Sequence, residues 1–231
     1  MESLRKLLNK QQTELRQVMT SFDQHDKAIR LFLRQHAMLH SSKLVPSATE
    51  GMAQSELWSF EDEILNDMSE EQIRRIPRNC EHSVAWCIWH IARIKDVTMN
   101  LLVASSPQVL HRENWLAAIK TRARDTGNAM DEEGMAQLSA TIDIEALRAY
   151  RVAVGHRTRE IVGQLEPKDL KQKVEPDRLQ KVLEQGAVVE AAMGIVDYWG
   201  KRNIAGLLLM PATRHHIVHL NEALRLKQRS N

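Results

Sequence analysis

The sequence predicts an all-α protein built around four long helices. Apolar residues recur at three- and four-residue steps through long windows, which is the helical period, whereas the alternating pattern of a half-buried strand is almost absent. Clusters that contain proline or glycine separate these windows. The 231 residues are enough to bury one sizeable core. We therefore expect the four helices near residues 25–43, 83–103, 143–165 and 203–228.

Composition and charge argue against a nucleic-acid-binding or membrane protein. The chain has 32 basic and 30 acidic residues, a net charge of +2, whereas nucleic-acid binding needs concentrated positive charge, so we expect no nucleic-acid partner. Its apolar runs are too short to cross a bilayer, and its first residues do not resemble a signal peptide. Cys80 and Cys87 would lie about 10 Å apart on one helix, too far for a disulfide. We therefore expect a cytoplasmic protein with no membrane association.

The first predicted element is a helical extension, residues 1–24, which precedes the bundle of residues 25–231. Apolar residues follow a heptad-like seam from Leu4 to Leu39, which predicts one long helix that ends before Pro46. A single apolar seam must be covered, either by its own bundle or by a second subunit. Of these two alternatives, we expect a homodimer.

Short elements connect the long helices. Ser69 and Gln72 have the spacing of a capping box, which predicts one short helical turn after them. Residues 107–142 are irregular, with short helices at best. Within residues 166–186, which contain Pro167 and Pro176, we expect a short helix with a C-terminal cap at Gly186, because glycine suits the position that follows a helix.

Three of the long helices carry distinct local signals. Residues 83–103 are apolar nearly all round, so this helix is expected at the centre of the bundle. Asp143 can cap the helix that follows it. Pro211 lies inside the last helix and should kink it, because proline removes one backbone hydrogen bond there.

Two histidines of the last helix, His215 and His219, are four residues apart. Such residues project from one helical face, one turn apart, and their imidazoles can chelate one divalent ion. A third ligand must come from another helix, and His90, in the middle of the most apolar helix, is the natural candidate. Three neutral histidines leave coordination positions open for water or substrate. His36 and His40 share the same spacing, so the spacing alone also fits a polar patch or a hydrogen-bonded core histidine.

Two segments favour the metal interpretation by resemblance. Residues 82–96 read HSVAWCIWHIARIKD, and residues 214–222 read RHHIVHLNE. They are similar to the second and last helices of the DinB-like (YfiT-like) metal-binding four-helix-bundle superfamily. Residues 125–130 and 149–151 resemble one branch of that family. The resemblance covers about residues 30–228 and implies a four-helix bundle in up-down-down-up order, with long crossovers.

The resemblance also implies a metal site and its ligands. A divalent ion, zinc or nickel, would be held by His90, His215 and His219. The sequence departs from the family at two positions that are not ligands. His82 stands where the family usually has asparagine, and Asn221 stands where it usually has glycine.

Family members with an assigned activity include thiol-cofactor-dependent transferases and a thiol-dependent isomerase, and others look like metal-dependent hydrolases. The resemblance thus implies an enzyme that acts on a small-molecule substrate. Its metal would bind a low-molecular-weight thiol or water and lower the pKa of that ligand. The alternative is a non-catalytic helical interaction module stabilised by the metal. Three protein ligands with an exchangeable position favour chemistry, and four favour a structural site.

Further side chains near the predicted ligands have expected roles. Cys87 precedes His90 by one turn and is expected to be buried and inert. Glu222 lies three residues past His219, where it could orient that imidazole or be a solvated carboxylate. His216 points about 100° away from the ligands around the helix, so we expect it at the surface or beside the site rather than as a ligand.

Overall fold

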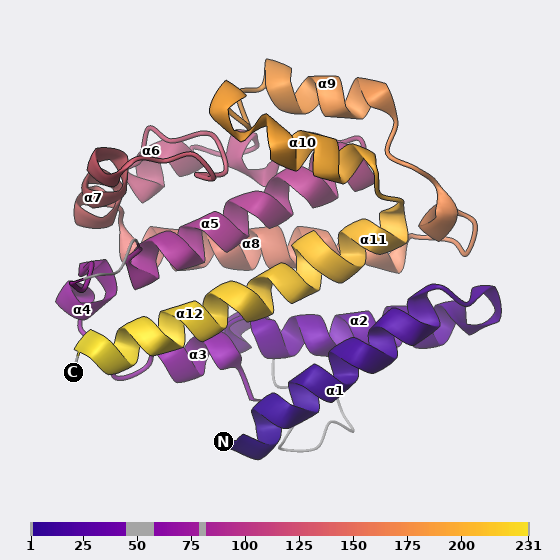
Figure 1. Ribbon diagram of the computed structural model, residues 1–231, viewed down its shortest axis with the longest axis horizontal. Helices are drawn as coiled ribbons and strands as arrows, with labels where there is room; N and C mark the ends of the chain where they lie inside the picture. Colours follow the sequence, from indigo (N-terminus) through magenta and orange to yellow (C-terminus); the bar gives the residue numbers. More distant parts are fainter. Residues whose placement is uncertain (1, 45–57, 79–81, 231) are drawn as a thin grey trace.

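The computed structural model describes residues 2–44, 58–78 and 82–230, which leaves Pro46 and Cys80 outside the description. These residues form helices and connecting turns (Figure 1), with one isolated antiparallel bridge between Lys173 and Asn203 among them. The all-α fold class is therefore confirmed, and the up-down-down-up order stays a prediction. The α-helices are α1 (Glu2–Met19), α2 (His25–Leu39), α3 (Phe60–Leu65), α4 (Glu70–Arg74), α5 (Val84–Asp96), α6 (Trp115–Ile119), α7 (Glu132–Thr141), α8 (Ile144–Gly163), α9 (Pro176–Glu184), α10 (Met193–Gly200), α11 (Ile204–Leu209) and α12 (His215–Ser230). A π-helical segment, Val97–Val103, continues α5, and another, Met210–Arg214, joins α11 to α12.

The N-terminal seam lies on two helices, so the prediction of one long helix is wrong. α1 ends at Met19 and α2 begins at His25, with extended backbone at Ser21 between them. The Ser21 hydroxyl donates to the Asp23 carboxylate at 3.3 Å, and such local side-chain bonds compete with helix continuation. The chain turns back at this point, and α1 packs against α2 and α11 (Figure 1).

The bundle itself covers the seam of α1. The buried seam residues are Leu8, Leu15 and Val18. The Gln12 side-chain amide also donates to the Leu209 carbonyl at 3.1 Å, which ties α1 to α11. The side chains of two further seam residues, Leu4 and Phe22, lie outside the described part. Of the two alternatives for covering the seam, the structure shows packing within the chain.

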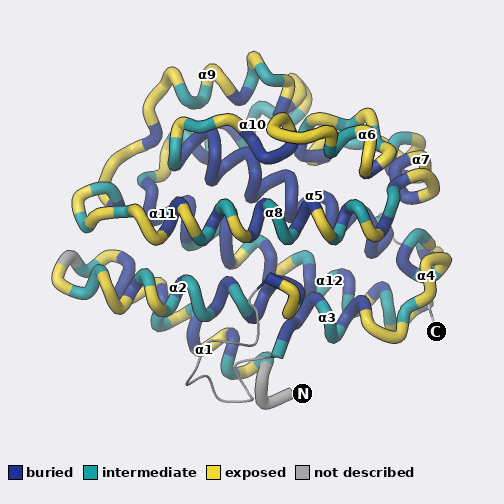
Figure 2. The backbone as a smooth tube through the Cα atoms, turned by 180° about the vertical axis from the view of Figure 1, so that it is seen from behind, coloured by how far each residue is buried: buried dark blue, intermediate teal, exposed yellow. Residues whose placement is uncertain are grey.

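The helix expected at the centre of the molecule, α5 with its π-helical continuation, lies there. Every residue from Val84 to Val103 is buried (Figure 2). The helix begins at a conventional cap, because the Ser83 hydroxyl accepts a hydrogen bond from the Trp86 backbone N–H at 3.0 Å. α5 packs between α8 and α12, which cover apolar faces that a surface helix would expose.

Pro211 lies in a π-helical segment that interrupts the last long helix. The kink expected there stays a prediction. Proline has no backbone N–H and clashes with the preceding turn, so the regular ladder cannot pass through it. The Thr213 hydroxyl lies 3.0 Å from the carbonyls of both Leu208 and Leu209, and it supplies a donor to that turn. Regular α-helix resumes at His215.

The helix caps predicted from the sequence are present in the structure, both at a short helix of a crossover and at a long helix. Ser69 and Gln72 form a capping box at the start of α4, and Asp143 caps α8. Gly186 has a positive φ just after α9, as expected for a residue that follows a helix. α10 was not predicted, and it brings Trp199 into the core. Within the described residues, every helix is too short or too polar to cross a membrane.

Candidate metal centre

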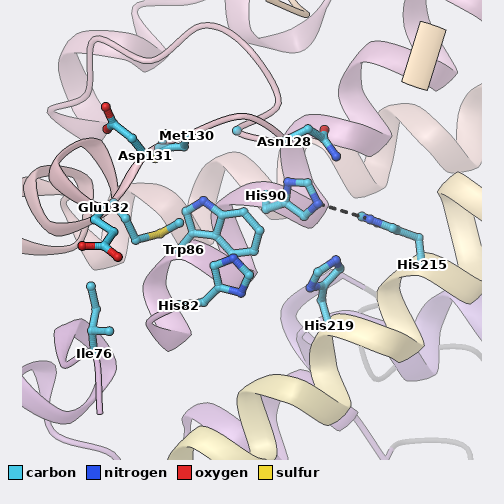
Figure 3. Close-up of a pocket in the computed structure, with 12 residues that line it drawn as sticks. Ile76, His82, Trp86, His90, Asn128, Met130, Asp131, Glu132, His215 and His219 are labelled. Carbon is cyan, nitrogen blue, oxygen red and sulfur yellow. Dashed lines mark hydrogen bonds between the residues drawn. The ribbon is translucent and has the colours of Figure 1, made fainter. Parts of the chain in front are cut away.

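The three predicted ligands come together where α5 faces α12 (Figure 3). The ring centroid of His90 lies 4.9 Å from that of His215 and 4.7 Å from that of His219, and the last two are 4.6 Å apart. The Nε2 atoms of His90 and His215 are 3.2 Å apart. One nitrogen of each ring lies within 4.8 Å of the others. Such a set can surround one ion at the usual Zn–N distance of about 2.0–2.1 Å.

The second ring nitrogen is held in two of the three ligands. His90 Nδ1 donates to the Thr126 carbonyl at 2.5 Å, and His219 Nδ1 donates to Glu222 Oε2 at 2.8 Å. A neutral imidazole that donates from Nδ1 keeps a lone pair on Nε2, which is what a metal ligand needs. His215 Nδ1 is buried and has no hydrogen-bond partner among the described residues.

The carbonyl that holds His90 belongs to a turn that only glycine fits. Gly127 has a φ of 77°, and a Cβ there would lie 2.4 Å from the Trp89 ring. The Asp125 carboxylate accepts the Gly127 N–H at 2.6 Å and shapes the turn. The role of Thr126 was not predicted. No local pattern in the sequence shows that its carbonyl would meet His90.

Burial keeps two of the candidate ligands, His90 and His215, neutral. Burial and then His219 lower the pKa of His90 to about 3. Burial, followed by the two neighbouring imidazoles, holds the pKa of His215 well below its ordinary value. A protonated imidazole cannot bind a metal, so these shifts keep both rings able to do so at neutral pH.

One carboxylate, that of Glu222, joins the ligand His219 to a fourth histidine, His82. Glu222 Oε1 accepts from His82 Nδ1 at 2.6 Å, while Oε2 accepts from His219. Partial burial acts to raise the pKa of Glu222, but the hydrogen bonds from His219 and His82 outweigh it and lower that pKa well below its ordinary value. The hypothesis that Glu222 orients a ligand ring is therefore supported by its geometry.

The ligands face a cavity of about 880 Å³ (Figure 3). The Trp86 ring stacks on His90 with centroids 4.4 Å apart, and His82 stacks on Trp86 at 3.7 Å. The remaining lining residues lie just after α4, in the segment before α7 and in α7 itself: Ile76, Gly127, Asn128, Met130, Asp131, Glu132 and Met135. The cavity has room for a small molecule beside an ion.

A second set of ligand atoms overlaps the first and includes Cys87, His219 and Glu222. Burial and then the Glu222 charge raise the pKa of the Cys87 thiol well above its ordinary value, which disfavours the thiolate that a metal would need. Both Glu222 oxygens already accept hydrogen bonds from histidines. Cys87 is buried as predicted, and the three-histidine set is the better candidate.

Three other histidines, His36, His40 and His216, form a separate buried cluster. Of the two positions expected for His216, at the surface or beside the site, the first is therefore wrong. The ring centroid of His40 lies 4.2 Å from that of His36 and 5.7 Å from that of His216. Lys95 Nζ donates to His40 Nε2 at 2.7 Å, and an Arg151 nitrogen donates to His216 Nδ1 at 3.3 Å. Within the described residues, these rings belong to no set with metal-ligand spacing.

Comparison with protein families places the chain in a known family. Residues 57–223, more than half of the chain, match the DinB superfamily. The matched range contains all three candidate ligands and leaves α1 and α2 outside it. A comparison with curated proteins finds no match.

Proposed function

Because the chain belongs to the DinB superfamily, we propose that it is a divalent-metal-dependent enzyme that acts on a small molecule. Its metal ligands would be His90, His215 and His219. One observation carries the proposal: the imidazoles of buried His90 and half-buried His215 and His219 converge at the wall of a cavity of about 880 Å³. A purely structural site has no use for such space beside the ligands.

The donor set fits zinc or nickel. Neutral imidazoles suit both ions, and the hydrogen bonds of His90 and His219 direct the Nε2 lone pairs of these two rings toward the shared position. Three ligands would leave a position that faces the cavity. When bound, the ion would supply Lewis acidity that lowers the pKa of a thiol or a water molecule.

We infer that the substrate is a small electrophile and that the nucleophile is a low-molecular-weight thiol or water. Trp86, Met130 and Met135 provide apolar walls for the carbon skeleton of such a substrate. With a thiol, the reaction would be transfer of the thiol to the electrophile, and with water it would be hydrolysis.

The alternative is a non-catalytic module in which the metal only stabilises the helices. That role usually needs a fourth protein ligand. Among the described residues, the thiol near the site is that of Cys87, which is buried with a raised pKa, and Glu222 already accepts hydrogen bonds from His82 and His219. These contacts support the enzyme over the structural role.

Elemental analysis of the purified protein, followed by thiol binding, tests the proposal. We expect about one divalent ion per chain. In the cobalt-loaded protein, 2-mercaptoethanol should then produce a thiolate-to-cobalt charge-transfer band. A screen for thiol conjugation to electrophiles would follow with the native metal present. Four protein ligands by X-ray absorption, or a cobalt protein that binds no thiol and turns over no electrophile or ester, would contradict an enzyme of this kind.

A further inference from the structure

His82 is a fourth histidine of the cavity, outside the three-ligand set. It immediately precedes Ser83, the cap of α5, and lines the cavity together with the three ligands (Figure 3). One face of its ring stacks on Trp86, with 3.7 Å between centroids and 3° between planes. Its side chain is 21 % exposed, so a molecule in the cavity can reach it. The α5 cap and Trp86 thus hold this imidazole at the wall.

Glu222 fixes the direction and the tautomer of the His82 ring. A carboxylate only accepts hydrogen bonds, so the 2.6 Å contact with Oε1 requires a proton on His82 Nδ1. The neutral ring then carries its lone pair on Nε2, an atom with no hydrogen bond among the described residues. The same carboxylate imposes the same tautomer on His219. One anion therefore prepares two Nε2 lone pairs, one in the ligand set and one at the cavity wall.

We propose that His82 is the general base of this cavity and that Glu222 is its positioning residue. The proposal rests on the function proposed above, because it assigns the proton of the nucleophile that enters beside the three ligands. His82 Nε2 accepts that proton, and Glu222 keeps Nε2 free for it.

The step balances without any oxidant or reductant. The S–H bond of a thiol, or an O–H bond of water, breaks, and its electron pair stays on sulfur or oxygen as the nucleophile. The proton forms a bond with His82 Nε2, and the positive charge of the resulting imidazolium faces the Glu222 carboxylate. The protonated ring can later return that proton to the leaving group or to water.

The cavity lining also contains two acidic side chains, those of Asp131 and Glu132. The Asp131 carboxylate caps α7 by accepting the Gly134 N–H at 2.8 Å. Glu132 is exposed to solvent in the first turn of the same helix. Neither has the arrangement of His82, an imidazole held by a carboxylate at the wall.

Substitution of His82 by asparagine in the zinc-loaded protein tests the proposal. An asparagine amide can still donate to Glu222, but it cannot accept a proton. Calorimetric titration with 2-mercaptoethanol in phosphate, HEPES and Tris at one pH counts the protons released to the buffer. We expect His82→Asn to release about one more proton per bound thiol than the wild-type protein, and to lower kcat/KM for thiol transfer by roughly 10²–10⁴-fold. His156→Asn, an exposed position on α8 outside the cavity lining, should change neither.

The outcomes separate this proposal from the proposed function. Equal proton release by wild type and His82→Asn, with thiol bound by both, would overturn the role of His82 and leave the proposed function intact. Failure of the wild-type protein to bind thiol and to turn over any electrophile or ester would instead overturn the proposed function. Loss of zinc from His82→Asn would show a structural role and refute the base. If His82→Asn does not fold, the nitrogen NMR chemical shifts of the wild-type imidazoles still test the proposal. A proton on Nε2 of neutral His82 would contradict it.

Discussion

At the scale of single residues, burial sets the charge states of the histidines. His36 and His40 are almost fully buried, and Lys95 lies 2.7 Å from the His40 ring. Burial first, and then the Lys95 charge, hold the pKa values of both histidines well below the ordinary value. Both rings therefore stay neutral in the folded protein at pH values where an exposed histidine would be charged.

The stability of the metal-free protein should consequently fall as the pH drops below about 6.5. Above that pH the histidines are neutral in both states and contribute no pH dependence. Below it, the unfolded chain binds protons that the folded chain does not, so unfolding is favoured down to the folded pKa. His36 and His40 should each cost about 1.4 kcal/mol per pH unit in that window. Urea unfolding at pH 7.5, 6.5 and 5.5 measures this slope, and an unfolding free energy that stays level would contradict it.

The metal site gives a second prediction at this scale. His90→Ala should remove most of the metal, because the two histidines left on α12 chelate poorly without the ring from α5. The loss of affinity should exceed the roughly 10–100-fold effect of removing only a partner of a ligand. His36→Ala is a matched control, since it also empties a buried histidine position but removes no candidate ligand. Metal content by mass spectrometry separates the two variants, and equal losses would refute the site.

At the scale of elements, the turn at Gly127 couples the irregular crossover to α5. Gly127→Ala would place a methyl group 2.4 Å from the Trp89 ring at a backbone conformation that alanine rarely adopts. We expect a loss of roughly 1–3 kcal/mol in unfolding free energy. Metal affinity should also fall, because the Thr126 carbonyl that holds His90 moves with the turn.

Gly163→Ala is the control for that substitution. This glycine ends α8 with nothing within 4 Å of the added methyl group, so its replacement should change stability by less than about 1 kcal/mol, in the favourable direction. Urea unfolding and zinc titration of both variants test the pair. A Gly127→Ala protein with wild-type zinc affinity would show that the turn does not orient His90.

At the scale of the whole molecule, the homodimer remains a proposal. The α1 part of the seam, which suggested the homodimer, is buried by α2 and α11 of the same chain. A homodimer of chains folded in this way would therefore use another surface. Light scattering of the full chain should give about twice 26.5 kDa if the dimer exists, and a mass near 26.5 kDa would contradict it.

Deletion of residues 1–22 then separates two kinds of dimer. A dimer that uses another surface survives the deletion. One formed by exchange of α1 between chains would dissociate to a single-chain mass. In either case the truncated protein should unfold at lower urea concentration, because the faces of α2 and α11 that α1 covers become exposed.

Most of the helices and the three candidate ligands could be predicted from the sequence. Helical period and capping act within one or two turns, so the cap of α8 at Asp143 and the shared face of His215 and His219 can be predicted locally. The inclusion of His90 needed one further argument, that the most apolar helix lies at the centre of a bundle.

The surroundings of those ligands depend on tertiary packing and could not be predicted from the sequence. The chain turns back at Ser21, between α1 and α2, and this turn buries the apolar seam within the protein. A heptad pattern is compatible with one long helix and equally with a helical hairpin. Contact with Arg151 of α8 buried His216, and the packing of α5 on α12 brought His82 to Glu222 across 140 positions. Such contacts depend on how distant elements pack against one another, and the local chemistry of one helix does not encode that packing.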